Sequence, residues 1–192
     1  SNHIILKRTT ATGVSYLFEW DEHTPSARCQ RQWADNGAYD YRFKWQLRRK
    51  ISYATDGNGN VREYHFNDND KVVKEIDPEG GVTRRLFDSY GHLCSETLPD
   101  GQTTYYRYDL LGNVTRITDA LNHTTRIRYN AAGLPLLITD ALGHQWHRRY
   151  NERGLLTETR DPSGSIWRYD YNDKGQLETL TDPEGGKRQL QW

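Results

Sequence analysis

Residues 108–133 have the sequence YDLLGNVTRITDALNHTTRIRYNAAG, and this stretch decides the fold because it contains the start of the same pattern twice. Tyr108 and Asp109 are followed by Gly112, and 21 residues later Tyr129 and Asn130 are followed by Gly133. A fixed period of this length indicates an array in which one small supersecondary unit is repeated.

The same period runs outward in both directions. Aspartate recurs every 21 residues at Asp35, Asp56, Asp77, Asp119, Asp140, Asp161 and Asp182, with Leu98 as the exception on this grid. Ten residues after each grid position stands an aromatic residue: Trp45, Phe66, Phe87, Tyr108, Tyr129, Tyr150, Tyr171 and Trp192. At an aromatic content of 12%, chance would fill about one of these eight positions. The repeat is therefore a property of almost the whole chain.

Each repeat holds two short units in which Asp or Asn precedes a glycine by three residues. Asp or Asn suits the first position of a type I turn, and glycine supplies the positive φ with which the chain re-enters a strand. The turn that begins at each grid aspartate has Ala38, Gly59, Gly80, Gly101, Asn122, Gly143, Gly164 and Gly185 at its fourth position. The second turn has Arg49, Asp70, Gly91, Gly112, Gly133, Gly154 and Gly175 there.

The segments between turns are about six residues long, which is a typical strand length. Aromatic and polar residues alternate in residues 39–45 and 167–171, as expected for strands and not for helices. The pattern predicts an all-β fold, an antiparallel up-and-down meander of 21-residue hairpins. We assign residues 35–192 to the repeats and residues 1–34 to lead-in strands with a degenerate copy, in which residues 22–28 form an insertion loop and residues 3–7 are a further strand.

Two faces follow from the alternation. Tyr108, Tyr129, Tyr150 and Tyr171 should form a ladder of rings along one face, because the repeats stack in register. The opposite face should be wet and carry Arg84, Arg107, Arg126, Arg128, Arg149 and Arg168, with partial cover from Ile51, Val72, Leu93, Val114, Leu156 and Leu177. Pro135 interrupts that apolar column and predicts a local bulge or a sheet edge.

Composition limits the alternatives. Only 34% of residues are hydrophobic, which is low for a compact two-layer core, while the aromatic content and a net charge of zero argue against disorder. The neutral balance also argues against a generic nucleic-acid binder, and no apolar run could span a bilayer. Cys29 and Cys94 are expected to be free thiols. Because the chain has no methionine, we interpret it as an internal segment of a longer protein.

The unit in residues 108–112 and 129–133 resembles the YD repeat of the RHS family. The linkers at residues 77–81 and 182–186 look like inter-repeat turns of that family, and residues 18–21, 28–29 and 37–40 are similar to the lead-in of bacterial Rhs proteins. The resemblance covers nearly the whole chain. It implies a curved sheet that is part of the wall of a hollow β-cocoon.

In that family the cocoon encloses a C-terminal toxin, and many members are effectors of the type VI secretion system. The resemblance therefore implies a structural role in toxin delivery, with a bacterial cytoplasmic location before export and release to a target cell afterwards. The implied partners are the remaining shell repeats, the toxin domain and a secretion-spike protein that binds a missing N-terminal region. An edge-to-edge homodimer is a further prediction, because open sheet edges can pair.

The histidines, cysteines and repeated aspartates fit structural roles better than catalytic or metal-binding ones. His123 and His144 share a repeat position, but no third zinc ligand is evident. Cys94 occupies a strand position that is apolar in other repeats, and no catalytic partner accompanies Cys29. The repeated aspartates suit turns better than a glycosidase pair. We therefore expect no enzymatic activity, no cofactor and no metal. The alternative is a cell-surface adhesion or carbohydrate-binding module, whose aromatic rows would stack on sugars.

Overall fold

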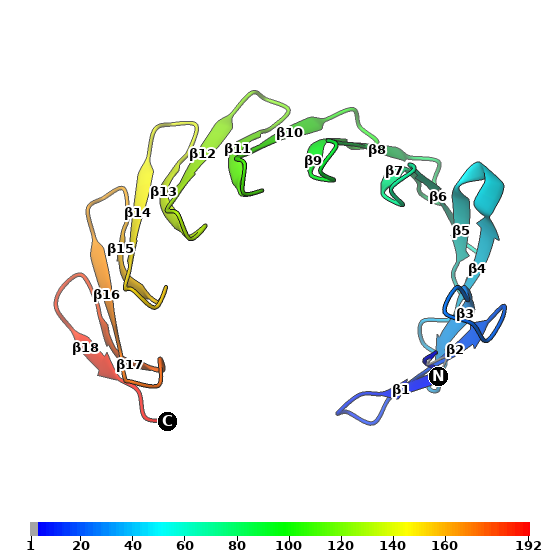
Figure 1. The fold of residues 1–192 in the computed structure, drawn as a ribbon, viewed down its shortest axis with the longest axis horizontal. Coiled ribbons are helices and arrows are strands. Elements are labelled where there is room, and N and C mark those ends of the chain that lie inside the picture. The colour runs from blue at the N-terminus through cyan, green and yellow to red at the C-terminus, as the bar shows by residue number, and fades with distance from the viewer. Residues whose placement is uncertain (1–3) are drawn as a thin grey trace. The chain divides into compact units, whose positions relative to one another are not determined.

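The computed structural model describes residues 4–192, and in this part of the chain the fold is all-β, as the repeat predicts (Figure 1). The chain divides into two units, one ending at Gly101 and the other comprising Gln102–Trp192. The expected lead-in, residues 1–34, is thus part of a larger first unit, and the sequence pattern contains no signal for a division near Gly101.

Over residues 4–101 the first unit contains nine strands and one short 3-10 helix. They are β1 (Lys7–Thr9), β2 (Ser15–Trp20), β3 (Cys29–Ala34), β4 (Tyr41–Gln46), the 3-10 helix Leu47–Arg49, β5 (Ile51–Thr55), β6 (Val61–Phe66), β7 (Val72–Ile76), β8 (Val82–Phe87) and β9 (Leu93–Thr97). Each strand pairs antiparallel with the next one along the chain, so the unit is an up-and-down meander.

The second unit is a meander of the same kind. Its strands are β10 (Thr103–Tyr108), β11 (Val114–Thr118), β12 (Thr124–Tyr129), β13 (Pro135–Thr139), β14 (Gln145–Tyr150), β15 (Leu156–Arg160), β16 (Ile166–Tyr171), β17 (Leu177–Thr181) and β18 (Lys187–Gln189). In the pairs β10–β11, β12–β13, β14–β15 and β16–β17 the register shifts by one residue just before the aromatic position, for example between Arg128 and Tyr129.

That shift corrects the expectation about Pro135. A bulge does lie opposite it, but the same bulge precedes Tyr108, Tyr150 and Tyr171, where no proline is present. It belongs to the repeat and not to the proline. Pro135 is tolerated because it is the first residue of β13, a position where a missing N–H costs no central ladder bond.

The turns follow the predicted pattern from residue 56 onward, and the grid exception at Leu98 still forms its turn through a bond from Gly101 N–H to the Leu98 carbonyl. In the two earliest turns the assignment was wrong by one residue. The fourth position of the first turn is Gly37, with φ 81°, and not Ala38. In the next turn it is Lys50, with φ 55°, and not Arg49, because a 3-10 turn displaces it.

The lead-in contains the predicted insertion as the loop between β2 and β3. The further strand, expected at residues 3–7, lies at Lys7–Thr9 instead and pairs with β2. The first position of the expected strand, His3, lies outside the described residues.

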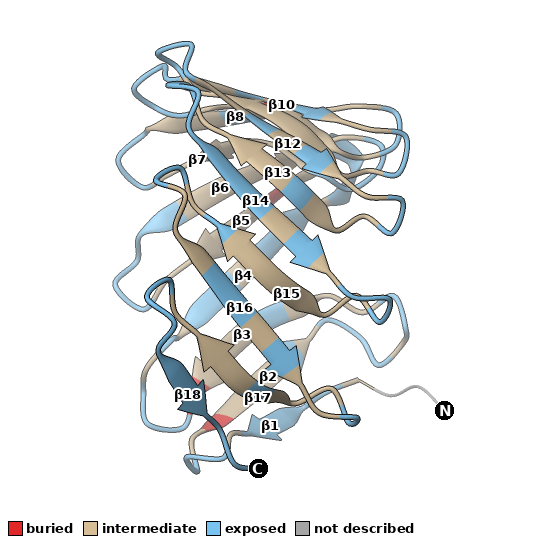
Figure 2. Ribbon diagram, turned by 90° about the vertical axis from the view of Figure 1, so that its left-hand side faces the viewer, coloured by how far each residue is buried: buried red, intermediate tan, exposed pale blue. Residues whose placement is uncertain are grey.

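Neither unit has a hydrophobic core of the usual kind. Among residues 4–192, Ala34 is the one buried apolar residue, at 1% exposure, and three small polar residues, Ser15, Ser52 and Ser95, are also buried. Figure 2 accordingly shows half-buried and exposed strands almost throughout. A single-layer sheet has this property because each strand has only its two neighbours and one partly covered face. Local hydrogen bonds must therefore supply much of the order, and they define the functional element.

Candidate functional site: the repeating hairpin

The turn that begins at Asp56 shows how the grid aspartates from Asp56 onward act. Its Oδ1 accepts from the backbone N–H groups of Asn58 and Asn60, both at 2.9 Å, while its own carbonyl accepts from Gly59 at 3.0 Å. One carboxylate thereby satisfies two backbone donors that would otherwise face water alone. The aspartate is a structural part of the turn in this geometry.

The other turns that begin with Asp or Asn repeat this arrangement. At each of them a backbone N–H four residues on donates to the Asx side chain: at Asn67, Asp77, Asp88, Asp109, Asp119, Asn130, Asp140, Asn151, Asp161, Asn172 and Asp182. The glycines Gly91, Gly112, Gly133, Gly154 and Gly175 all have φ between 75° and 86°. This is the left-handed region, which costs a residue with a Cβ about 1–2 kcal/mol.

The aromatic column bonds to the backbone of the preceding repeat. The hydroxyls of Tyr129, Tyr150 and Tyr171 donate to the carbonyls of Val114, Pro135 and Leu156 at 2.8, 3.0 and 2.9 Å. Indole N–H groups do the same: Trp192 donates to Leu177 at 2.8 Å, Trp45 to Cys29 at 2.9 Å and Trp20 to Ile5 at 3.0 Å. The sequence predicted a ladder of rings and missed these bonds.

The strand register explains why those carbonyls are available. Between β11 and β12 the ladder consists of three residue pairs next to the turn, from Thr118 opposite Thr124 to Arg116 opposite Arg126. Val114 lies two residues beyond the end of that ladder, and there its carbonyl accepts from the Tyr129 hydroxyl. A backbone carbonyl without a partner is costly, and the tyrosine hydroxyl supplies the missing donor. The hydroxyl bond thus connects β11 and β12 beyond the point where the backbone ladder between them ends.

Phe66 and Phe87 occupy this column without a polar tip, and Tyr108 is the last residue of β10. The signal for the bonds was present in the sequence: apart from the two phenylalanines, every column member carries an O–H or N–H at the far end of its ring. A period alone does not show which atom that end reaches.

The comparison with family models decides the family. The RHS Repeat model matches residues 87–124, 108–145, 129–165 and 150–187, which together span more than half of the 192 residues. The chain belongs to the RHS repeat family. Its hairpins, turns and aromatic column are therefore RHS repeats, as the resemblance at residues 108–112 and 129–133 indicated.

Solved structures show the same fold. A TcdB2-TccC3-Cdc42 structure is 17% identical with a TM-score of 0.64, and a TcdB2-TccC3 structure is 19% identical with a TM-score of 0.63. A Tc holotoxin pore from Photorhabdus luminescens that carries a TccC3 mutation is 17% identical with a TM-score of 0.56. Each similarity covers 92% of this chain and 11% of the other chain, so these RHS repeats span only a small part of those proteins. No curated protein matches the chain.

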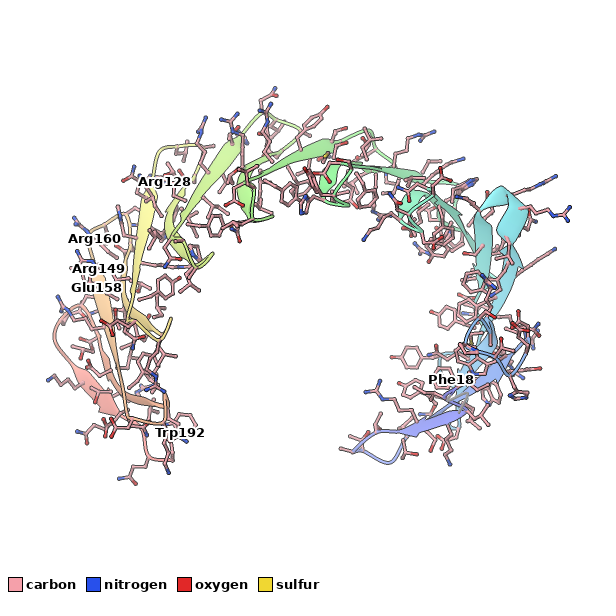
Figure 3. All side chains as sticks on the ribbon, in the orientation of Figure 1. Phe18, Arg128, Arg149, Glu158, Arg160 and Trp192 are labelled. Carbon is pink, nitrogen blue, oxygen red and sulfur yellow. The ribbon has the colours of Figure 1, made fainter. Side chains whose placement is uncertain are left out.

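In the first unit, one face of the RHS repeats is aromatic. Strand register places Phe18, Gln32 and Tyr41 side by side, and Phe43 and Trp45 follow Tyr41 along β4. The Tyr41 and Phe43 rings are 6.5 Å apart and nearly parallel, at 16°. Figure 3 shows Phe18 on the concave side of this unit's sheet.

An ion-pair ladder continues that face across four strands. Arg62 contacts Glu75 at 2.5 Å, Glu75 contacts Arg85 at 3.2 Å, and Arg85 contacts Glu96 at 2.8 Å. Burial alone would raise the pKa of Glu75, but hydrogen bonds from Arg62 and Arg85 outweigh it and lower that pKa. Glu75 is therefore a charged link between neighbouring hairpins, and nothing in the sequence period pointed to it.

The cysteines and histidines have structural environments. Cys29 and Cys94 are both free thiols, as expected. Burial raises the pKa of Cys29, which disfavours the reactive thiolate. His123 and His144 each bind the aspartate of their own turn, at 3.1 and 2.8 Å.

Within residues 4–192 no group of three or more His, Cys, Asp or Glu side chains could hold a metal ion. No helix among these residues has the length and apolar character needed to cross a bilayer.

Proposed function

We propose that this segment is part of a shell wall in a longer polypeptide, where its RHS repeats help to enclose a C-terminal toxin until delivery. The observation that supports it is the fold: an extended sheet with almost no core of its own, shared with a small part of the Tc-toxin chains. A sheet of this kind gains stability from neighbouring repeats, and its surface area makes it suited to surrounding something.

The finer elements of the proposal come from the resemblance to bacterial Rhs proteins. Delivery would use the type VI secretion system, with a spike protein as a partner. The protein would wait in the bacterial cytoplasm and then reach a target cell. The segment would have no catalytic activity and need no cofactor, because its acidic side chains serve turns and ion pairs.

Limited proteolysis of the longer polypeptide tests enclosure. The region that follows the repeats should resist protease in the parent protein and become cleavable in a Gly133→Val/Gly154→Val variant, because valine cannot adopt the required positive φ at either position. Gly57→Ala, at a glycine without positive φ, is the matched control and should preserve resistance. A C-terminal region that is equally cleavable in all three proteins would refute enclosure.

A specific observation keeps the carbohydrate-binding alternative testable. A hollow of about 520 Å³ in the first unit is lined by Tyr41, Phe43 and Tyr64 together with the polar Asp56 and Arg62. Aromatic rings flanked by polar groups suit sugars. Retention of this chain on a glycan array, lost in Tyr41→Ala/Phe43→Ala, would favour the adhesion module over the shell wall.

A further inference from the structure

One face of the second unit is an array of guanidinium groups, which we call the arginine face. It consists of Arg107, Arg116, Arg126, Arg128, Arg149, Arg160 and Arg168, which strand register places on the same side of β10 to β16. Figure 3 shows Arg128, Arg149 and Arg160 on the convex side of this unit's sheet. Six of the seven arginines are exposed, and Arg116 is half-buried.

The sheet itself does not explain this array. Arg107 lies directly opposite Arg116, and Arg116 lies directly opposite Arg126, so three neighbouring strands present like charges in one row. Like charges directly opposite each other destabilise a sheet. This destabilising arrangement of like charges recurs on three neighbouring strands, which indicates that the arginines have a role outside the sheet.

The chain's own acidic groups do not neutralise the face. Glu158 lies between Arg149 and Arg168 at 3.7 and 3.6 Å, and Asp170 follows Arg168 on the same side of β16. These two carboxylates face seven guanidinium groups. The turn aspartates are already engaged, since their oxygens accept backbone N–H groups at the ends of the hairpins. The whole chain has a net charge of zero, but this face of the second unit carries an excess of positive charge.

The array also has an apolar floor. A hollow of about 510 Å³ is lined by five arginines and one carboxylate, with Leu137 and Ile166 among the apolar residues between them; the charged residues are Arg128, Arg148, Arg149, Glu158, Arg160 and Arg168. Leu137 lies opposite both Arg128 and His147, and Ile166 lies opposite Arg160. The cations and the apolar groups thus alternate within the same rows.

We propose that the arginine face docks an acidic polypeptide segment of a partner protein, one in which apolar side chains alternate with carboxylates. Arginine pairs well with carboxylates because its guanidinium can donate two parallel hydrogen bonds. The apolar floor favours a polypeptide over a nucleic acid or a lipid headgroup, since a phosphate backbone would leave Leu137 and Ile166 without a partner. The arginine face would bind such a segment whether or not the sheet encloses a toxin.

Fluorescence anisotropy on the 192-residue chain tests the proposal. The probe is a labelled octapeptide of alternating Glu and Leu, titrated at about 0.15 M ionic strength so that distant charges are screened. Saturable binding is expected. Arg128→Gln/Arg160→Gln should weaken it about tenfold, because two charge-assisted contacts are removed. Within residues 4–192 neither arginine forms an ion pair with an acidic residue, so the fold should persist, which circular dichroism checks.

Arg48→Gln/Arg49→Gln is the matched control: it removes the same charge from two exposed arginines of the 3-10 turn in the other unit. It should change the affinity less than twofold, and a probe with Ser in place of Leu should bind more weakly than the original. The proposal is overturned if the probe does not saturate or if both double variants lose affinity equally. Tighter binding of oligo-dT or of phosphatidylserine vesicles than of the peptide would overturn it as well.

Discussion

The hydroxyl of Tyr150 reaches the carbonyl of Pro135, one repeat earlier, and closes a seam that the strand ladder leaves open. The same bond recurs at Tyr129 and Tyr171, and indole groups replace the phenol at Trp45 and Trp192. Since the sheet has almost no core, each such bond carries a larger share of the stability than it would in a globular domain.

Tyr150→Phe should therefore lower the free energy of unfolding by about 1 kcal/mol, because it removes one hydrogen bond and leaves the Pro135 carbonyl without its donor. Phe87→Tyr is the reciprocal change. By repeat equivalence it places a hydroxyl near the carbonyl of Val72, and it should raise the free energy of unfolding by a similar amount. Urea unfolding followed by circular dichroism measures both. Equal stability of all three proteins would show that the hydroxyl bond contributes nothing.

At this scale the sequence predicted which residues matter but not what they do. The 21-residue spacing identified the aromatic column, yet it could not tell ring-to-ring contacts from bonds of a ring's polar end to the backbone. That distinction depends on where the ladder between β11 and β12 ends, which is a property of strand register.

The β-hairpin is the repeating structural unit of this protein, and its turns fix the register of the strands that flank them. From Asp56 onward the residue spacing located the turns, because Asp or Asn and a positive-φ residue at fixed separation leave little choice of conformation. The displacements at Gly37 and Lys50 lie in the degenerate start of the array. There an insertion and a 3-10 turn compete with the repeat pattern.

The turn at residues 56–59 contains two glycines with different conformations, which gives a matched pair. Gly59 has φ +85°, whereas Gly57 lies outside the left-handed region and a Cβ there would make ordinary contacts at 3.7 Å. Gly59→Ala should cost about 1 kcal/mol, while Gly57→Ala should be neutral or stabilising by up to about 1 kcal/mol. Thermal unfolding of the two variants checks this, and an equal loss in both would exclude backbone conformation as the cause.

Over the whole molecule, turn carboxylates link stability to pH. A side-chain hydrogen bond from Asn60 leads the lowering of the Asp56 pKa, and one from Asn113 does so at Asp109. A carboxyl whose pKa is lower in the folded state stabilises the fold above its unfolded pKa, and this contribution is lost as the pH falls through the folded value. With an unfolded pKa of about 3.9, stability should decline below about pH 5.

Asp56→Asn/Asp109→Asn should reduce this acid sensitivity. Asparagine already occupies the first turn position at Asn130 and Asn151, the repeat equivalents of Asp109, and there it accepts backbone N–H groups in the same pattern without titrating. Thermal melts between about pH 3 and pH 7 should show a smaller fall in Tm for the double variant than for the parent. An unchanged or larger fall would mean that other groups control the acid response.

The general fold was predictable from the sequence because each repeat contains its own turn and strand signals, and composition correctly indicated little interior. The division near Gly101 and the ladder from Arg62 to Glu96 were not, and of the arginine face the sequence predicted five members but missed Arg116 and Arg160. These features arise from contacts between strands of different repeats. They depend on how individual repeats differ, whereas a sequence period shows only what the repeats have in common.

The tyrosine bond also bears on how such a protein can change its length over evolutionary time. Each repeat whose column residue is tyrosine or tryptophan carries a donor for the repeat before it, and the bonded repeats each supply an acceptor carbonyl to the repeat after them. An in-frame duplication or deletion of one complete repeat would therefore leave no donor or acceptor unmatched at the new junction. The gene can lengthen or shorten by recombination between its own copies, and selection can adjust the size of the product without redesigning a single contact.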